Sequence, residues 1–133
     1  MALDITKPGI DLGIVTANGE AMTAFYGGTL GLPHVGEFKM GGGTVMQRFQ
    51  CGDSVVKVVV LPGEAPATAA PGGINGATGL RYFTITVSDI SASVAACEEA
   101  GATIAVPPTE LRPGITIAMV EDPDGNWVEL LAG

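Results

Sequence analysis

The alternation of apolar and polar positions along this chain predicts short strands interrupted by two helices. Residues 10–16 alternate strictly, which places Leu12 and Ile14 together on the buried face of a strand. Asn18 then has the side chain of a helix N-cap, and residues 20–30 carry apolar side chains at helical spacing. The chain is therefore predicted to open with a strand followed by a helix.

Three further strands are predicted after this first helix. Glycines at 41–43 mark one of the turns, and the strands are residues 32–38, 44–50 and 54–62. The last strand is rich in Val, and Lys57 is the one charged residue within it. The first half of the chain thus has the order β, α, β, β, β.

The second half repeats this order after a linker. Residues 63–78 are rich in Pro, Ala and Gly and show almost no periodicity, as linkers do. Gly9 and Gly79 lie 70 positions apart, as do Gly31 and Gly101, which favours internal duplication of a βαβββ unit. The elements predicted for the second half are a strand at 80–87, a helix at 90–101 capped by Ser88 or Asp89, a strand at 102–106, a loop at 107–114, and strands at 115–121 and 126–131.

A tight turn connects the last two predicted strands. Asp122, Pro123 and Gly125 are residue types that close such turns. After the turn, Glu129 shares one strand face with Trp127, although burying an unpaired carboxylate is costly. Glu129 therefore either faces water, or has a cation or hydrogen-bond donors beside it in a pocket.

Composition limits the class of protein. The 133 residues, of which 47% are apolar, predict one globular domain. The net charge of −8 argues against nucleic acids and anionic membranes as partners and is compatible with a cationic ligand. No apolar run approaches the roughly 18 residues of a membrane span and no signal peptide is recognisable, so we expect a cytoplasmic protein. Two cysteines are too few for a disulfide framework, and Cys97 is predicted to be a small core residue.

Three segments make the chain resemble the vicinal oxygen chelate superfamily, which groups glyoxalases, bleomycin resistance proteins and ring-cleaving dioxygenases. They are AFYGGTLGL at 24–32, TVSDISASV at 86–94 and EDPDGNWVELL at 121–131. The resemblance implies an α+β fold in which two βαβββ units, 9–62 and 79–131, form curved mixed sheets around a cavity. It also implies that residues 1–133, including the linker at 63–78, are a single domain of this type, and that the protein is a homodimer.

The resemblance further implies where a divalent metal would be held. Enzymes of the superfamily use a His on the first strand and a Glu on the last strand of each unit. Glu129 is the one matching residue, and a protonated Lys cannot ligate a metal, so we expect a degenerate metal site and no cofactor. If the central strand is aligned one position differently, Val56 takes the ligand position of Lys57. His34, the single histidine, is expected at the surface or at a strand edge and not as a ligand. The four residues at the ligand positions are Asp11, Tyr82, Lys57 and Glu129.

These four residues are expected to converge in one cavity. The Lys57 ammonium would stand in place of the metal between Asp11 and Glu129, with the Tyr82 hydroxyl completing the hydrogen bonds. The alternative is that Lys57 faces outward from an edge strand, where charges are common. An apolar cavity with a few polar tips suits a flat aromatic or a cationic organic ligand. The predicted ligand-binding residues are Trp127, Arg48, Gln50, Met46, Thr84, Val59 and Lys57.

Two functions follow from this expected site. The first is small-molecule binding, such as the sequestration of an antibiotic or another natural product. The alternative is an enzyme of the superfamily, of the lyase, isomerase, epimerase or dioxygenase type. In a metal-independent enzyme, Asp11 and Glu129 would act as general base and acid and Tyr82 would stabilise an oxyanion; a different register would allow a metal-dependent one. The sequence leaves open whether any ligand is turned over, and nothing specific favours a ligand-free interaction module.

Overall fold

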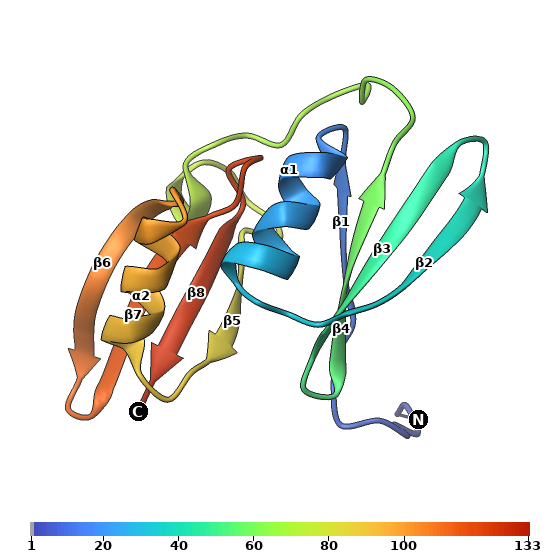
Figure 1. Cartoon of the computed structure of the whole chain (residues 1–133). Coiled ribbons are helices and arrows are strands. Elements are labelled where there is room, and N and C mark those ends of the chain that lie inside the picture. Colours follow the sequence, from blue (N-terminus) through green and yellow to red (C-terminus); the bar gives the residue numbers. More distant parts are fainter. Residues whose placement is uncertain (1) are drawn as a thin grey trace. The chain divides into compact units, whose positions relative to one another are not determined.

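The computed structural model describes residues 2–133, which divide into two compact units between Pro66 and Ala67 (Figure 1). Each unit contains one four-stranded mixed sheet and short helices. The predicted α+β fold of two βαβββ units is therefore confirmed. Within residues 2–133 no helix has both the length and the hydropathy needed to cross a lipid bilayer.

The first unit has the predicted order of elements. In its sheet the strands are ordered β1-β4-β3-β2, with β1 parallel to β4 and the other neighbours antiparallel. The Val-rich strand β4 is therefore a central strand. The elements are β1 (Leu12–Thr16), α1 (Gly19–Thr23), a π-helical turn (Ala24–Thr29), β2 (His34–Gly41), β3 (Thr44–Cys51) and β4 (Ser54–Val60).

The helical segment of the first unit covers one face of this sheet. A Cβ atom on Gly27 would lie 2.9 Å from the ring of Phe49, so the missing side chain allows the close approach of helix and β3. Met22, Tyr26, Phe49 and Val58 are almost completely buried. They are the core of this unit, and they lie on the covered side of the sheet or on the helix itself.

The start of α1 differs from the sequence-based prediction. Asn18 occupies the N-cap position, but its side chain makes no capping hydrogen bond. Instead, the backbone N–H of Asn18 donates to Oγ1 of Thr16 at 2.8 Å. The hydroxyl at the end of β1 therefore fixes the path of the chain into the helix.

The second unit repeats this arrangement. Its sheet is ordered β5-β8-β7-β6, again with the first and last strands of the unit, β5 and β8, in parallel pairing. The elements are a 3-10 turn (Gly73–Asn75), β5 (Tyr82–Thr86), α2 (Ile90–Glu99), β6 (Thr103–Arg112), β7 (Ile115–Glu121) and β8 (Trp127–Ala132).

The prediction of a loop at 107–114 is wrong, because β6 continues to Arg112. Prolines cannot donate to a sheet and are tolerated mainly in edge strands and bulges. The prolines at 107–108 meet both conditions, since β6 is an edge strand and its register with β7 shifts between Val106 and Thr109. The irregular pairing thus explains why sequence patterns failed to identify this strand.

Helix α2 begins at a side-chain cap and packs on one face of the second sheet (Figure 1). Oδ1 of Asp89 accepts the backbone N–H of Ala92 at 3.0 Å, which identifies Asp89 and not Ser88 as the cap. Val94 and Cys97 are buried, as predicted for the apolar side of this helix. Burial also raises the pKa of the Cys97 thiol.

A single carboxylate organises the turn between β7 and β8. Oδ1 of Asp122 accepts the backbone N–H groups of Asp124 and Asn126, both at 2.9 Å. The side-chain amide of Asn126 donates to the same carboxylate, at 3.3 Å to Oδ1 and 3.0 Å to Oδ2. Gly125 closes the turn with a φ of 88°. The predicted turn is confirmed, and Asp122, only 4% exposed, is its centre.

Replacing Asp122 by Ala should lower the free energy of unfolding by roughly 2–4 kcal/mol, because two backbone N–H groups and one side-chain amide lose their charged acceptor at once. Chemical denaturation monitored by circular dichroism would measure this loss. Asp53→Ala is the matched control, since Asp53 is an exposed turn residue of the first unit and its loss should change stability by less than about 0.5 kcal/mol. Equal effects of the two substitutions would contradict the assigned role of Asp122.

Candidate functional site

A row of paired residues crosses the face of the first sheet that α1 leaves uncovered. Residues paired between neighbouring strands lie on the same side of a sheet. Lys57 pairs with Gly13 of β1 and with Arg48 of β3, and Arg48 pairs with Gly36 of β2. Phe49, next to Arg48 in the strand, points to the covered side. We call the row Gly13, Lys57, Arg48 and Gly36 the cationic row.

Asp11 lies beside this row, just before β1, and is contacted by two lysines. Its Oδ2 lies 3.8 Å from Nζ of Lys57. Its Oδ1 accepts from Nζ of Lys7 at 2.6 Å and from the backbone N–H of Val55 at 2.9 Å. The Lys7 ammonium, followed by the Val55 N–H, lowers the pKa of Asp11. The expected pairing of Asp11 with Lys57 is therefore found. Lys7 was missed, although its spacing of four positions from Asp11 was visible in the sequence.

Two of the alternatives for this strand are wrong. Lys57 cannot guard a sheet edge, because β4 is flanked by β1 and β3. A slip that would place Val56 at the metal-ligand position is excluded as well. Val56 pairs with Leu12 and Phe49 on the covered face and is only 4% exposed.

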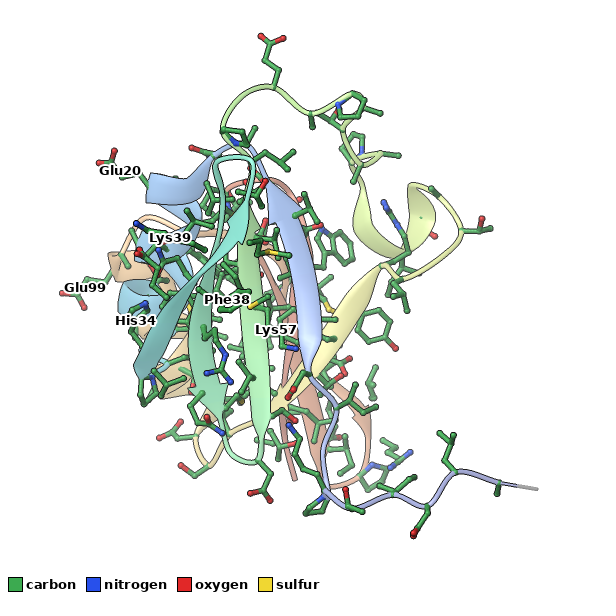
Figure 2. The ribbon with its side chains drawn as sticks, turned by 90° about the vertical axis from the view of Figure 1, so that its right-hand side faces the viewer. Glu20, His34, Phe38, Lys39, Lys57 and Glu99 are labelled. Atoms are coloured by element: carbon green, nitrogen blue, oxygen red, sulfur yellow. The ribbon has the colours of Figure 1, made fainter. Side chains whose placement is uncertain are left out.

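An apolar row runs beside the cationic row on the same face. Its outer members, Val15 and Phe38, are 60% and 58% exposed. Phe38 and Lys57 of this sheet are labelled in Figure 2. On the other side of the cationic row, the amide of Gln50 donates to the carbonyl of Gly52 and so lies toward the β3–β4 turn. The apolar row consists of Val15, Val59, Met46 and Phe38, in the order of the strands β1, β4, β3 and β2.

The corresponding face of the second sheet carries Glu129. Tyr82 pairs with Trp127, and Thr84 pairs with Glu129, across the parallel strands β5 and β8. The hydroxyl of Thr84 donates to Oε1 of Glu129 at 2.6 Å. Glu129 thus has a hydrogen-bond donor beside it in an exposed hydrogen bond, and the pocket around it stays a prediction. Tyr82 is 47% exposed on the same face.

Trp127 is fixed at its edge and on one side of its ring. Its Nε1 donates to Oε1 of Glu121 at 3.1 Å. The backbone of Gly73 lies against the indole, since a Cβ atom there would be 2.1 Å from Cδ2 of Trp127. Arg81 holds this segment by donating to the carbonyls of Gly73 and Ala70, both at 2.7 Å. Sequence analysis missed Gly73 and Arg81, because a Pro- and Gly-rich stretch gives no sign of which glycine supports a ring.

The two registers show which positions of the two units correspond. In each unit, the first strand pairs in parallel with the last, and a helix covers one face of the sheet. The pair Gly13 and Lys57 on the uncovered face of the first sheet corresponds to the pair Thr84 and Glu129 on the uncovered face of the second. The resemblance implied the same correspondence. The convergence of these residues in one cavity stays a prediction. The corresponding pairs are Asp11 and Tyr82, Gly13 and Thr84, and Lys57 and Glu129.

His34 lies on the edge strand β2 and is exposed, as predicted. Its Nε2 is 2.6 Å from Oε1 of Gln47, and its ring contacts that of Phe49 at a centroid distance of 5.3 Å. These contacts place it on the covered side of the sheet, away from Lys57. In the part of the chain that the structure describes, no three His, Cys, Asp or Glu side chains are grouped so as to hold a metal ion.

Comparisons with known proteins agree with the fold. The family model for the Glyoxalase/Bleomycin resistance protein/Dioxygenase superfamily matches residues 10–130. A putative glyoxalase family protein from Bacillus anthracis is 22% identical, with a TM-score of 0.71 and coverage of 100% of this chain and 99% of that chain. TioX from Micromonospora sp. ML1 is 17% identical, with a TM-score of 0.66 and coverage of 92% and 93%.

A glyoxalase I mutant from Zea mays is also similar, at 17% identity and a TM-score of 0.74. The match covers 95% of this chain but 44% of the maize chain. No curated protein sequence matches significantly. At these identities the solved structures show a common fold and nothing finer.

The charge of Asp11 should stabilise the first unit in a pH-dependent way. Because its pKa in the folded protein lies below the ordinary 3.8, its contribution is present above that pH and is lost as the pH falls through the folded value. We expect Asp11→Asn to lower the melting temperature at pH 7, and the difference from the unchanged protein to shrink as the pH falls through the folded pKa of Asp11, because the protonated carboxyl group is neutral as well.

Carbon-13 NMR titration of the Asp11 carboxyl group would measure the pKa directly. Lys7→Gln should raise it toward the ordinary value, because the Lys7 hydrogen bond is the largest cause of the shift. Lys39→Gln, which removes the same charge from the opposite face of the sheet, should leave it unchanged. A pKa that is insensitive to Lys7→Gln would contradict this assignment.

Substitution of Gly73 by Ala should disturb Trp127. The new Cβ would overlap the indole, and the φ of +55° is costly for any residue with a side chain, so we expect a loss of at least about 2 kcal/mol. A shifted emission maximum of this single Trp should accompany the loss. Gly63→Ala is the matched control, because a Cβ there meets no atom within 4 Å. Unchanged fluorescence in Gly73→Ala would contradict the packing described.

Proposed function

Because the chain belongs to the Glyoxalase/Bleomycin resistance protein/Dioxygenase superfamily, we propose that it binds a small organic ligand without using a divalent metal. The observation that carries this proposal is the ion pair of Lys57 with Asp11. The resemblance assigns these two residues to positions where the superfamily's enzymes hold their metal. Sequestration of an antibiotic or another natural product is the form of binding that this change favours.

The side chains at the four metal-ligand positions do not fit a metal. An ammonium group repels a cation and has no free electron pair at neutral pH, so Lys57 is the wrong donor. Asp11 already accepts hydrogen bonds from Lys7 and Val55, which compete for its lone pairs. Of the four metal-ligand positions, Glu129 is therefore the one that carries the residue type used by the superfamily's enzymes.

The same contacts argue against acid–base catalysis by Asp11. A general base works best with a pKa near the working pH, whereas the Lys7 ammonium moves the pKa of Asp11 further down. Glu129 accepts a hydrogen bond from Thr84, which orients a carboxylate but supplies no second proton-transfer group. Binding without turnover is therefore favoured over the enzymatic alternative.

The uncovered sheet faces provide the binding surface in this proposal. In the first unit, apolar side chains such as Met46 and Val59 lie beside the polar tips of Arg48 and Lys57. Such a combination suits an organic molecule whose ring is buried and whose polar group is oriented. In the second unit, Thr84 and Trp127 are the side chains on the uncovered face that the resemblance assigns to ligand binding. We further propose a homodimer in the cytoplasm, as the resemblance and the composition imply.

Metal titration tests the proposal most directly. Protein produced with manganese, iron, nickel and zinc should contain no stoichiometric metal, and calorimetric titration with each ion should show no binding in the micromolar range. In contrast, small aromatic compounds should raise the melting temperature and be recovered chemically unchanged after incubation. Benzoate, benzamide and benzylamine form a suitable first panel, because they share a ring and differ in charge.

Tight, stoichiometric metal binding that is lost in Glu129→Ala would overturn the proposal. A metal-dependent enzyme would then be the favoured alternative. Conversion of a bound compound would overturn the assignment of binding without turnover. If the double variant Asp11→Ala, Glu129→Ala abolished that conversion while retaining binding, the acid–base alternative would be the correct one.

A further inference from the structure

Positive charge collects on the uncovered face of the first sheet, although the whole chain has a net charge of −8. Of the six Lys and Arg residues in the sequence, Lys57 and Arg48 lie in the cationic row, and Lys7 adjoins it through Asp11. Within residues 2–133, Asp11 is the one carboxylate that forms an ion pair with this group, and its shortest contact is with Lys7 at 2.6 Å. Three cations and one carboxylate therefore give this group a net charge of +2.

Arg48 carries one of these charges. Within the described chain its guanidinium forms no ion pair and no side-chain hydrogen bond. It stands directly opposite Lys57, and like charges at opposing positions destabilise a sheet. Lys57 itself reaches Asp11 at 3.8 Å, which is longer than a hydrogen bond. A cation that costs stability and forms no ion pair within the described chain, such as Arg48, is typical of a binding site.

Glycines flank the two cations and leave space for a ligand. A Cβ atom on Gly13 would meet nothing within 4 Å, so the surface beside Lys57 is open. A Cβ on Gly36 would lie 3.9 Å from Nη1 of Arg48, which shows that the guanidinium extends over β2. The two glycine positions therefore carry no side chain that would stand between an oxyanion and the cations.

The apolar row adjoins these cations at a distance set by the strand geometry. Residues two apart in a strand are separated by about 7 Å, so the row from Val15 to Phe38 lies about that far from the row of Arg48 and Lys57. This spacing is close to the length of a molecule with one ring and one acidic group. Glu37, the nearest acidic residue in β2, pairs with Gln47 and thus belongs to the opposite face.

We propose that the uncovered face of the first sheet binds an organic oxyanion, a carboxylate or a phosphate monoester. Arg48 and Lys57 hold the acidic group, since the planar guanidinium donates two parallel hydrogen bonds to such oxygens. The apolar body of the ligand covers Met46, Val59 and the exposed ring of Phe38. The inference rests on the proposed small-molecule function. It assigns the ligand a negative charge, whereas the net charge of the chain suits a cationic ligand.

NMR titration of the full-length, nitrogen-15-labelled protein tests this assignment. The amide signals of Gly13 and Gly36 report on the two ends of the cationic row. Benzoate and phenyl phosphate supply the two kinds of oxyanion, and benzamide has the ring without the charge. Saturable shifts of both glycines are expected with at least one of the anions, at a dissociation constant at least about tenfold lower than for benzamide.

Variants separate a specific site from the effect of overall charge. Arg48→Gln and Lys57→Gln should each raise the dissociation constant for the bound anion about tenfold or more. Lys39→Gln is the matched control, because Lys39 lies on the neighbouring strand but faces the other side, where it pairs with Val45 (Figure 2). It should leave the constant unchanged. Phe38→Ser should weaken binding of benzoate or phenyl phosphate but not of inorganic phosphate.

Several results would overturn the proposal. Equal binding of benzamide and the anions would leave the proposed small-molecule function intact and remove the anion site. An equal loss in Lys39→Gln and Arg48→Gln would show that only net charge is sensed. The amide signals of Gly13 and Gly36 could instead shift with protein concentration and not with added anion. That result would show that a second copy of the chain covers this face.

Discussion

Parallel pairing of the first and last strand of each unit is the constraint on which the rest of this structure depends. Parallel strands need a long crossover, and here the helix and two further strands provide it. The pairing brings Asp11 to the backbone of Val55, and Thr84 to the carboxylate of Glu129, across more than forty positions of sequence. Without it, Asp11 would not reach Lys57 and Thr84 would not reach Glu129.

The helix of each unit determines which face of the sheet remains available. Because side chains alternate, the helix covers every second residue of a strand, and the others lie on the opposite face. Val56 and Val58 are buried on the covered side, while Lys57 between them keeps a side chain that is 35% exposed. A charge in the middle of an apolar strand is thus compatible with the core, and its position alone does not identify its partner.

Sequence patterns predicted the elements well where local chemistry determines them. The turn around Asp122 and the cap at Asp89 depend on residues within five positions of each other, and both are present. Predictions failed where a distant segment decides. The extent of β6 depends on its bulged pairing with β7, and the support of Trp127 depends on a glycine in the preceding linker. The pairing of Asp11 with Lys57 was predictable only through the resemblance, because alternation gives the face of a residue but not its neighbour in the next strand.

The duplicated register has an evolutionary consequence. A protein built from two identical chains must carry the same residue at both symmetry-related positions, so a change of sign at one is a change at both. Fusion of two copies into one gene removes that coupling. Since each half here has its own sheet and its own core, Lys57 and Glu129 can stand at corresponding places with opposite charges. Each half can therefore carry its own binding chemistry at equivalent positions of its sheet.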